Sequence, residues 1–243
     1  MTDLKILALD TSTTPCCAAL LAASEGTTLE GCASLEEPRD LSSQLMRLID
    51  DALQGASWTL DDVHLLAVGL GPGSWTGLRI GISAFKTLAQ ARELPLYGVS
   101  TFEALHRSVS GDSQKLVGVV APSRPGEIYG LVAQGRSGEA VKLWTPQAFA
   151  QALTSHEELT SVPFIVGTDE ATCEVVAASV SDIGACNPQI EMPTPQRVTH
   201  AVGEIAVKRH TEGRQEDGLR VEPLYLAPSN AERARAAKLA AKV

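Results

Sequence analysis

The same order of short apolar runs and longer amphipathic runs occurs twice along this chain, and this doubled order most limits how it can fold. The first half predicts three strands, a helix, a strand, a helix and a strand, over residues 5–10, 16–22, 27–35, 41–54, 63–70, 76–93 and 94–100. The second half predicts three strands, a helix, a strand and two helices, over residues 115–121, 126–134, 139–144, 145–153, 163–167, 170–179 and 195–210. Two halves of type βββαβα indicate an α/β protein divided near residues 100–115.

Charge and cysteine content restrict the class of protein. With 20 Lys and Arg against 29 Asp and Glu, the formal net charge is −9, so direct binding of tRNA or DNA is disfavoured. The five cysteines form an odd set without a CxxC pair, which favours a reducing compartment. Because the N-terminus has no long apolar segment and no stretch approaches membrane-spanning length, we expect a cytoplasmic protein without a membrane anchor.

The segment GLGPGSWTG at residues 69–77 joins a predicted strand to a predicted helix and matches none of three familiar catalytic loops. It lacks the Lys of a P-loop, has Pro72 where a nucleophile elbow needs Gly, and places the third glycine of a dinucleotide fingerprint one residue late, at Gly77. Two interpretations stay open: the glycines turn the strand into the helix, or free N–H groups at the helix start bind an anion. Weak candidates for a nucleotide contact are Asp10, Thr11, Ser12, Gly73 and Ser74.

The two helices of the first half carry more apolar residues than one buried face needs. In the first helix, which Asp40 is placed to cap and Gly55 to follow, Leu41 and Leu45 begin the main apolar stripe, and further apolar residues lie beside it. The second helix has one stripe of large apolar residues and a neighbouring stripe of small ones, namely Gly77, Gly81, Ala84 and Leu88. The small-residue stripe faces either the first helix of the same chain or a helix of another protein, and an exposed apolar patch usually marks an interface.

No metal site or catalytic residue is predicted. The histidines at 64, 106, 156, 200 and 210 show no HxxxH or HxH spacing, and HEELT at 156–160 misses the HExxH motif because Thr160 takes the place of the second ligand. The C-terminal stretch places Arg235, Lys238 and Lys242 on one helical face, as a small basic patch or a solvated helix end.

Four segments, read in order along the chain, resemble the TsaB family of bacterial subunits for tRNA threonylcarbamoyladenosine (t6A) biosynthesis. They are ILALDTSTTPCCAALL, GLGPGSWTGLRIGISAFKTLA, LPLYGVSTFEAL and EPLYL, and the resemblance is most specific at residues 69–105. It implies an actin-like, Hsp70-like (ASKHA) fold of two RNase H-like halves, 1–105 and 106–243, with the C-terminal segment packing back on the first half. This implied fold agrees with the doubled order of the elements.

The resemblance also implies a function without catalysis. Members of the TsaB family are related to the threonylcarbamoyltransferase TsaD, whose metal histidines form an HxxxH motif, whereas this chain offers His106 and then Ser110. It implies a subunit that pairs its two helices with those of TsaD in a four-helix bundle, with the ATPase TsaE and, indirectly, tRNA in the same complex. The expected interface residues are Leu41, Leu45, Met46, Ile49, Leu53, Gly77, Gly81, Ile82, Ala84, Phe85 and Leu88.

Several positions depart from the family pattern and keep alternatives open. Leu41 stands where His is frequent, Ala227 where Arg is common, and Pro122 where an acidic residue precedes Arg124 and Glu127. Without that acid, independent ATP hydrolysis is disfavoured, so no intrinsic cofactor is expected and ATP or ADP is left as a ligand of the complex interface. The alternatives are a glycoprotease-type metallopeptidase and an actin-like ATPase acting alone. We also expect the free chain to form a homodimer through the same helices.

Overall fold

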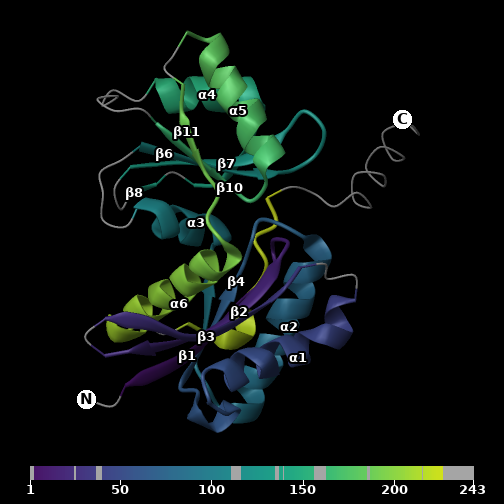
Figure 1. Cartoon of the computed structure of the whole chain (residues 1–243), viewed down its shortest axis with the longest axis vertical. Coiled ribbons are helices and arrows are strands. Elements are labelled where there is room, and N and C mark those ends of the chain that lie inside the picture. Colours follow the sequence, from purple (N-terminus) through teal and green to yellow (C-terminus); the bar gives the residue numbers. More distant parts are fainter. Residues whose placement is uncertain are drawn as a thin grey trace.

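A computed structural model gives the structure of the chain and describes residues 3–24, 26–36, 40–110, 116–134, 137–138, 140–155, 163–184, 187–214 and 216–226. Two sheets lie in two lobes, one above the other, with helices on their outer sides and between them (Figure 1). Each sheet corresponds to one of the halves predicted from the sequence, so the predicted α/β class is confirmed.

The first sheet has five strands in the order β3-β2-β1-β4-β5. Their bounds are β1 (Leu4–Asp10), β2 (Cys16–Ala23), β3 (Thr27–Leu35), β4 (Leu65–Gly69) and β5 (Leu96–Val99). β1 runs antiparallel to β2 and parallel to β4, which in turn runs parallel to β5. This mixture of directions results because hairpins join the first three strands and helices make the later connections.

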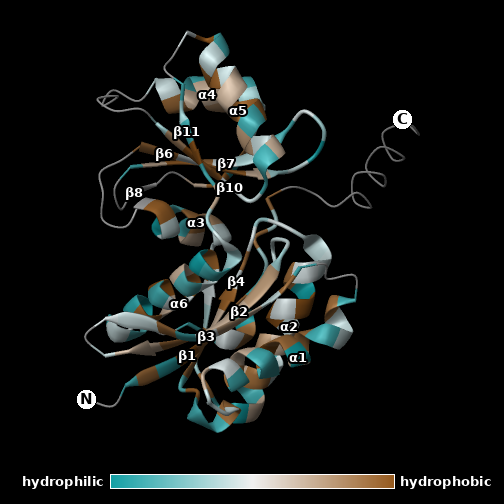
Figure 2. Cartoon of the chain, viewed as in Figure 1, coloured by the Kyte–Doolittle hydropathy of each residue, from teal (hydrophilic) through white to brown (hydrophobic). Residues whose placement is uncertain are grey.

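Both faces of this sheet are covered, and β1 shows how. Ile6 and Ala8 point into the core on one side, whereas Leu7 and Leu9 point into the core on the other. Helices α1 (Leu41–Gly55) and α2 (Trp75–Arg92) cover the second side, and α6 (Pro195–Thr211) covers the first. Strands buried on both faces are apolar throughout rather than alternating, and the central strands are correspondingly hydrophobic in Figure 2.

The second sheet repeats this topology. Its order is β11-β10-β6-β7-β8, and β9 also pairs with β7, so that β9-β7-β6-β10-β11 matches the first sheet strand for strand. Its elements are β6 (Leu116–Pro122), β7 (Ile128–Gln134), β8 (Ser137–Gly138), β9 (Lys142–Trp144), α4 (Pro146–Thr154), β10 (Phe164–Gly167), α5 (Glu170–Asp182) and β11 (Gln189–Glu191). Helices α4 and α5 pack together on its outer face.

The last helix of each half covers the sheet of the other half. Helix α3 (Thr101–Ser110) packs on β6 and β10, whereas α6 packs on β1, β2 and β4, and the two helices contact each other. Side chains from both sheets and both helices, among them Ile6, Phe102, Val117 and Val202, form one continuous core. The expected division after residue 105 falls within α3.

The structure corrects some local predictions. Gly55 is the last residue of α1, not the residue after it, and the positive φ, at 56°, belongs to Ser57. This end of α1 packs closely on β3, where a Cβ on Gly31 would lie 2.7 Å from the carbonyl oxygen of Ala52. Asp40 does precede α1, but its side chain makes no hydrogen bond to the backbone of the first turn. Helix α3 and strand β11 were not predicted.

In the part of the chain that the structure describes, every helix is too short or too polar to cross a bilayer.

Burial of the cysteines generates a first prediction. Burial raises the pKa of the Cys16 and Cys173 thiols to about 12 and that of Cys17 to about 11, whereas Cys32 is exposed. Because the thiolate is the reactive form, iodoacetamide at pH 8 should alkylate Cys32 first among these four residues. Peptide mass mapping after a time course of labelling measures this. Rapid native-state labelling of Cys173 would contradict the described core, and Cys32→Ser is the control.

Candidate partner-binding surface

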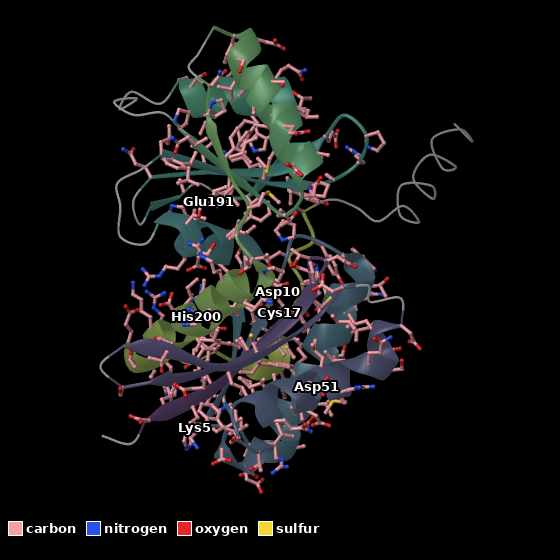
Figure 3. All side chains as sticks on the ribbon, in the orientation of Figure 1. Lys5, Asp10, Cys17, Asp51, Glu191 and His200 are labelled. Atoms are coloured by element: carbon pink, nitrogen blue, oxygen red, sulfur yellow. The ribbon has the colours of Figure 1, made fainter. Side chains whose placement is uncertain are left out.

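Asp10 ends β1 near the junction of the two lobes, and hydrogen bonds engage both of its carboxylate oxygens (Figure 3). Oδ1 accepts from the N–H of Ser12 at 2.7 Å and from its hydroxyl at 2.6 Å, and Oδ2 accepts from the hydroxyl of Thr101 at 2.9 Å. The Thr101 oxygen also accepts from the N–H of Gly71 at 3.2 Å. Only 2% of Asp10 is exposed, and burial raises its pKa while the hydroxyl groups of Ser12 and Thr101 oppose that shift. In this geometry the Asp10 carboxyl group joins the turn that follows β1 to Thr101, the first residue of α3.

The glycine loop closes over the turn that follows Asp10. Gly71 has φ of +84°, a conformation that favours glycine, and the N–H of Ser74 donates to the carbonyl of Ser12 at 2.7 Å. A Cβ on Gly73 would lie 2.2 Å from that carbonyl oxygen. Ser74 begins α2, and its hydroxyl accepts from the N–H of Gly77 at 3.2 Å. Gly73 and Ser74 are exposed, but both hold the loop to the turn.

The small-residue stripe of α2 faces the same turn. A Cβ on Gly77 would lie 2.1 Å from the carbonyl oxygen of Thr11, and one on Gly81 would lie 2.3 Å from its hydroxyl. That hydroxyl donates to the carbonyl of Gly77 at 2.9 Å. The assignment of Gly77 and Gly81 to a partner interface is therefore wrong, because their missing side chains let α2 approach the β1–β2 turn of its own chain.

Most of the large apolar residues expected at the interface are also used internally. Six of them are no more than 5% exposed and lie in the core between the first sheet and its helices, namely Leu41, Leu45, Ile49, Leu53, Ile82 and Phe85. Their assignment to direct partner contacts is wrong, because the sheet already covers them. Met46 is 45% exposed, and Ala84 and Leu88 are half-buried, so only these three can still contact another molecule.

The remaining apolar surface includes a residue that the sequence analysis missed. Ile80 is half-buried and, at spacings of four, lies on the same side of α2 as Ala84 and Leu88. Helices α1 and α2 lie side by side on one face of the sheet, as Figure 1 shows. We name Met46, Ile80, Ala84 and Leu88 the α1–α2 surface. The sequence analysis missed Ile80 because it followed the row of small residues that begins with Gly77 and Gly81, and these two glycines lie on the buried side of α2.

A pocket of about 200 Å³ lies where both helices begin, beside the β1–β2 turn. Its lining comes from the turn, from the start of α1 and from the start of α2, namely Thr11, Thr13, Thr14, Cys16, Asp40, Leu41, Ser42, Ser74, Thr76, Gly77 and Ile80. Asp40 carries the only charge among these side chains, because burial raises the pKa of the Cys16 thiol to about 12. Through Ile80 the pocket is continuous with the α1–α2 surface.

The C-terminal motif EPLYL lies against the start of α2. The N–H of Leu224 donates to the carbonyl of Leu70 at 2.9 Å, and the ring of Tyr225 stacks on that of Trp75 with centroids 3.9 Å apart. The guanidinium of Arg79 donates to the Tyr225 hydroxyl at 3.2 Å. No local sequence pattern signals this contact, because its members are about 150 residues apart.

Within the described residues, no three His, Cys, Asp or Glu side chains gather as metal ligands. His156 and the basic residues Arg235, Lys238 and Lys242 lie outside the described residues, as does Ala227. In the second half, β6 ends at Pro122, and the Arg124 guanidinium that follows pairs with the Glu127 carboxylate.

Comparisons with known proteins define the class first. A ROK family protein from Streptococcus pneumoniae aligns over 86% of this chain and all of its own, with a TM-score of 0.53 and 13% identity. YeaZ from Pseudomonas aeruginosa aligns over 92% of this chain and all of its own, with a TM-score of 0.71 and 23% identity. The fold is therefore the actin-like (ASKHA) fold that the sequence analysis expected.

The sequence comparisons find relatives that are named for tRNA threonylcarbamoyladenosine modification. The family model of TsaD, tRNA N6-adenosine threonylcarbamoyltransferase, matches residues 36–142. The tRNA threonylcarbamoyladenosine biosynthesis protein TsaB of Escherichia coli is 36% identical over 132 residues, which are 52% of this chain and 53% of that protein. The chain thus aligns with about half the length of this curated relative. Over these spans the chain is similar to TsaB and YeaZ proteins.

The Asp10 network leads to a prediction about stability. Asp10→Ala removes the acceptor of three hydrogen bonds and leaves the Ser12 and Thr101 donors buried without it. We expect a loss of roughly 3 kcal/mol in the free energy of unfolding. Urea denaturation followed by circular dichroism measures it. A loss near zero would show that these hydrogen bonds do not hold the turn.

The raised pKa of Asp10 predicts the sign of a pH effect. The folded state binds the Asp10 proton more tightly than the unfolded chain, so the protein loses stability as pH rises from the unfolded pKa of about 4 through the higher folded pKa. Asp10→Asn has no such titration. The stability of wild type minus that of Asp10→Asn should therefore fall between pH 4 and pH 7 in urea denaturation, and a rise would mean that Asp10 is stabilised as the anion.

Proposed function

We propose that this chain is a non-catalytic subunit of the tRNA t6A modification machinery, which binds a TsaD-like threonylcarbamoyltransferase and supports its activity. The supporting observation is the α1–α2 surface, where Met46 is 45% exposed above a core that the chain seals by itself. The E. coli relative is named as a t6A biosynthesis protein, which is the basis for the choice of pathway.

The contact we infer is narrower than a whole helix face. The large residues of α1 and α2 anchor both helices to the sheet and keep the α1–α2 surface in place. A partner would add its own apolar side chains over Met46 of α1 and over Ile80, Ala84 and Leu88 of α2. Patches of half-exposed apolar residues on adjacent helices are typical of such interfaces.

The same surface would serve a homodimer of the free chain, since one self-complementary patch can pair with its copy. In the complex we place tRNA on the TsaD-like subunit, because the net charge of −9 disfavours direct contact between this chain and RNA. A TsaE-like ATPase would join the same complex. Binding of ATP or ADP at the junction also stays a proposal. The pocket beside the helices, at about 200 Å³, is smaller than the roughly 300–1,000 Å³ of most small-molecule sites, so the partner would have to supply walls.

Substitutions in the α1–α2 surface test the proposed function. Met46→Arg and Ala84→Arg each place a charge without a partner in a contact that becomes buried, so we expect binding to a TsaD-like subunit from the same organism to weaken about a hundredfold. Isothermal titration calorimetry with both purified subunits measures the affinity, and t6A content of tRNA in cells carrying each variant measures function.

The matched control is Gln90→Arg, which adds the same side chain to an exposed site on the far side of α2. It should bind like wild type, and all variants should show the wild-type melting temperature. Gly81→Arg is unsuitable, because the clash with Thr11 would disturb the fold itself. Wild-type affinity in both Met46→Arg and Ala84→Arg would refute the proposed surface.

A further inference from the structure

The pocket at the start of α1 and α2 has a definite chemical character. Serine and threonine residues make up most of its lining, and Leu41 and Ile80 are also part of it. Asp40 supplies a negative charge, and no Lys, Arg or His is among the described residues that line the pocket. A volume of about 200 Å³ suits one long side chain rather than a cofactor.

Hydrogen bonds favour the ionised form of the Asp40 carboxyl group. Its Oδ1 accepts from the hydroxyl of Ser42 at 3.0 Å, and hydrogen bonds from Ser43 and Ser42 lower the pKa of its carboxyl. Among the residues that the structure describes, no cation forms an ion pair with it. Within the first turn of α1 its side chain accepts from the Ser42 hydroxyl and not from a capping backbone N–H.

The start of α2 adds a partial positive charge to the pocket, which would favour an anion. The Ser74 hydroxyl already satisfies the N–H of Gly77, and the N–H of Ser74 is used on Ser12. The start of α1 adds a similar partial charge, and each helix start is equivalent to roughly half a charge. The Asp40 carboxylate carries a full charge, which a cation can contact directly. The pocket favours a cation.

We propose that this pocket receives a lysine or arginine side chain of the TsaD-like partner, with Asp40 as its counter-charge. This inference rests on the proposed function, because the pocket opens beside Ile80 of the α1–α2 surface and would be closed by whatever covers that surface. The buried apolar contact would supply affinity, and the ion pair would fix the register of the two helix pairs.

Asp40→Asn tests the inference without disturbing the fold. Asn begins helices as well as Asp does and can still accept from the Ser42 hydroxyl, so the melting temperature should not change. We expect binding to the TsaD-like subunit to weaken about five- to tenfold at low salt. Raising the salt concentration should then reduce the affinity of Asp40→Asn less than that of wild type, because the variant has no ion pair to screen. Calorimetry at two salt concentrations gives both values.

Asp51→Asn is the matched control, because it removes the same charge from an exposed residue of α1 that pairs with Arg47 and does not line the pocket. Tighter binding by Asp40→Asn would show that the pocket takes an anion, and equal affinity of the two variants would show that it takes no charge. Either result overturns the inference and leaves the proposed function standing if Met46→Arg still weakens binding. Absence of any complex with the wild-type chain overturns both.

Discussion

The close approach of α2 to the β1–β2 turn is the contact on which the rest of the first half depends. Gly77 and Gly81 allow the backbone of the helix to meet Thr11, and the Asp10 carboxylate draws the turn, the glycine loop and α3 together. A buried carboxyl group whose two oxygens both accept hydrogen bonds specifies one geometry, since any slip would leave buried polar groups unsatisfied. The direction of α2, and with it the outer face of the helix pair, follows from this junction.

That junction explains why the α1–α2 surface is small. The sheet takes the large apolar side chains of α1 and α2, the turn takes the glycines, and what remains is Met46 with the row that begins at Ile80. The pocket beside Asp40 exists for the same reason, because the loop and the turn pack on each other and leave the starts of both helices open. Stability thus depends on the inner sides of these two helices, and the proposed recognition on their outer sides.

The sequence predicted the fold well where a strand or helix can be recognised from its own pattern of apolar and polar residues. The apolar run that became β1 needed two covering layers, and the repeated order of elements indicated two similar sheets. It predicted the site poorly, because an apolar stripe on a helix has the same pattern whether a sheet or a partner covers it, as Phe85 shows. The short strand β11, with its sequence QIE, carries too little pattern, and the stacking of Tyr225 on Trp75 joins residues too distant for any local signal.

The exchange of α3 and α6 between the sheets affects the order in which the chain can assemble. All five strands of the first sheet are complete at Val99, but the helix that covers one of their faces ends at Thr211. At synthesis rates of about 5–20 residues per second, that face stays open on the ribosome for several seconds. The first sheet is therefore covered on both faces only after α6 has been made, and the core between the two sheets forms no earlier than that.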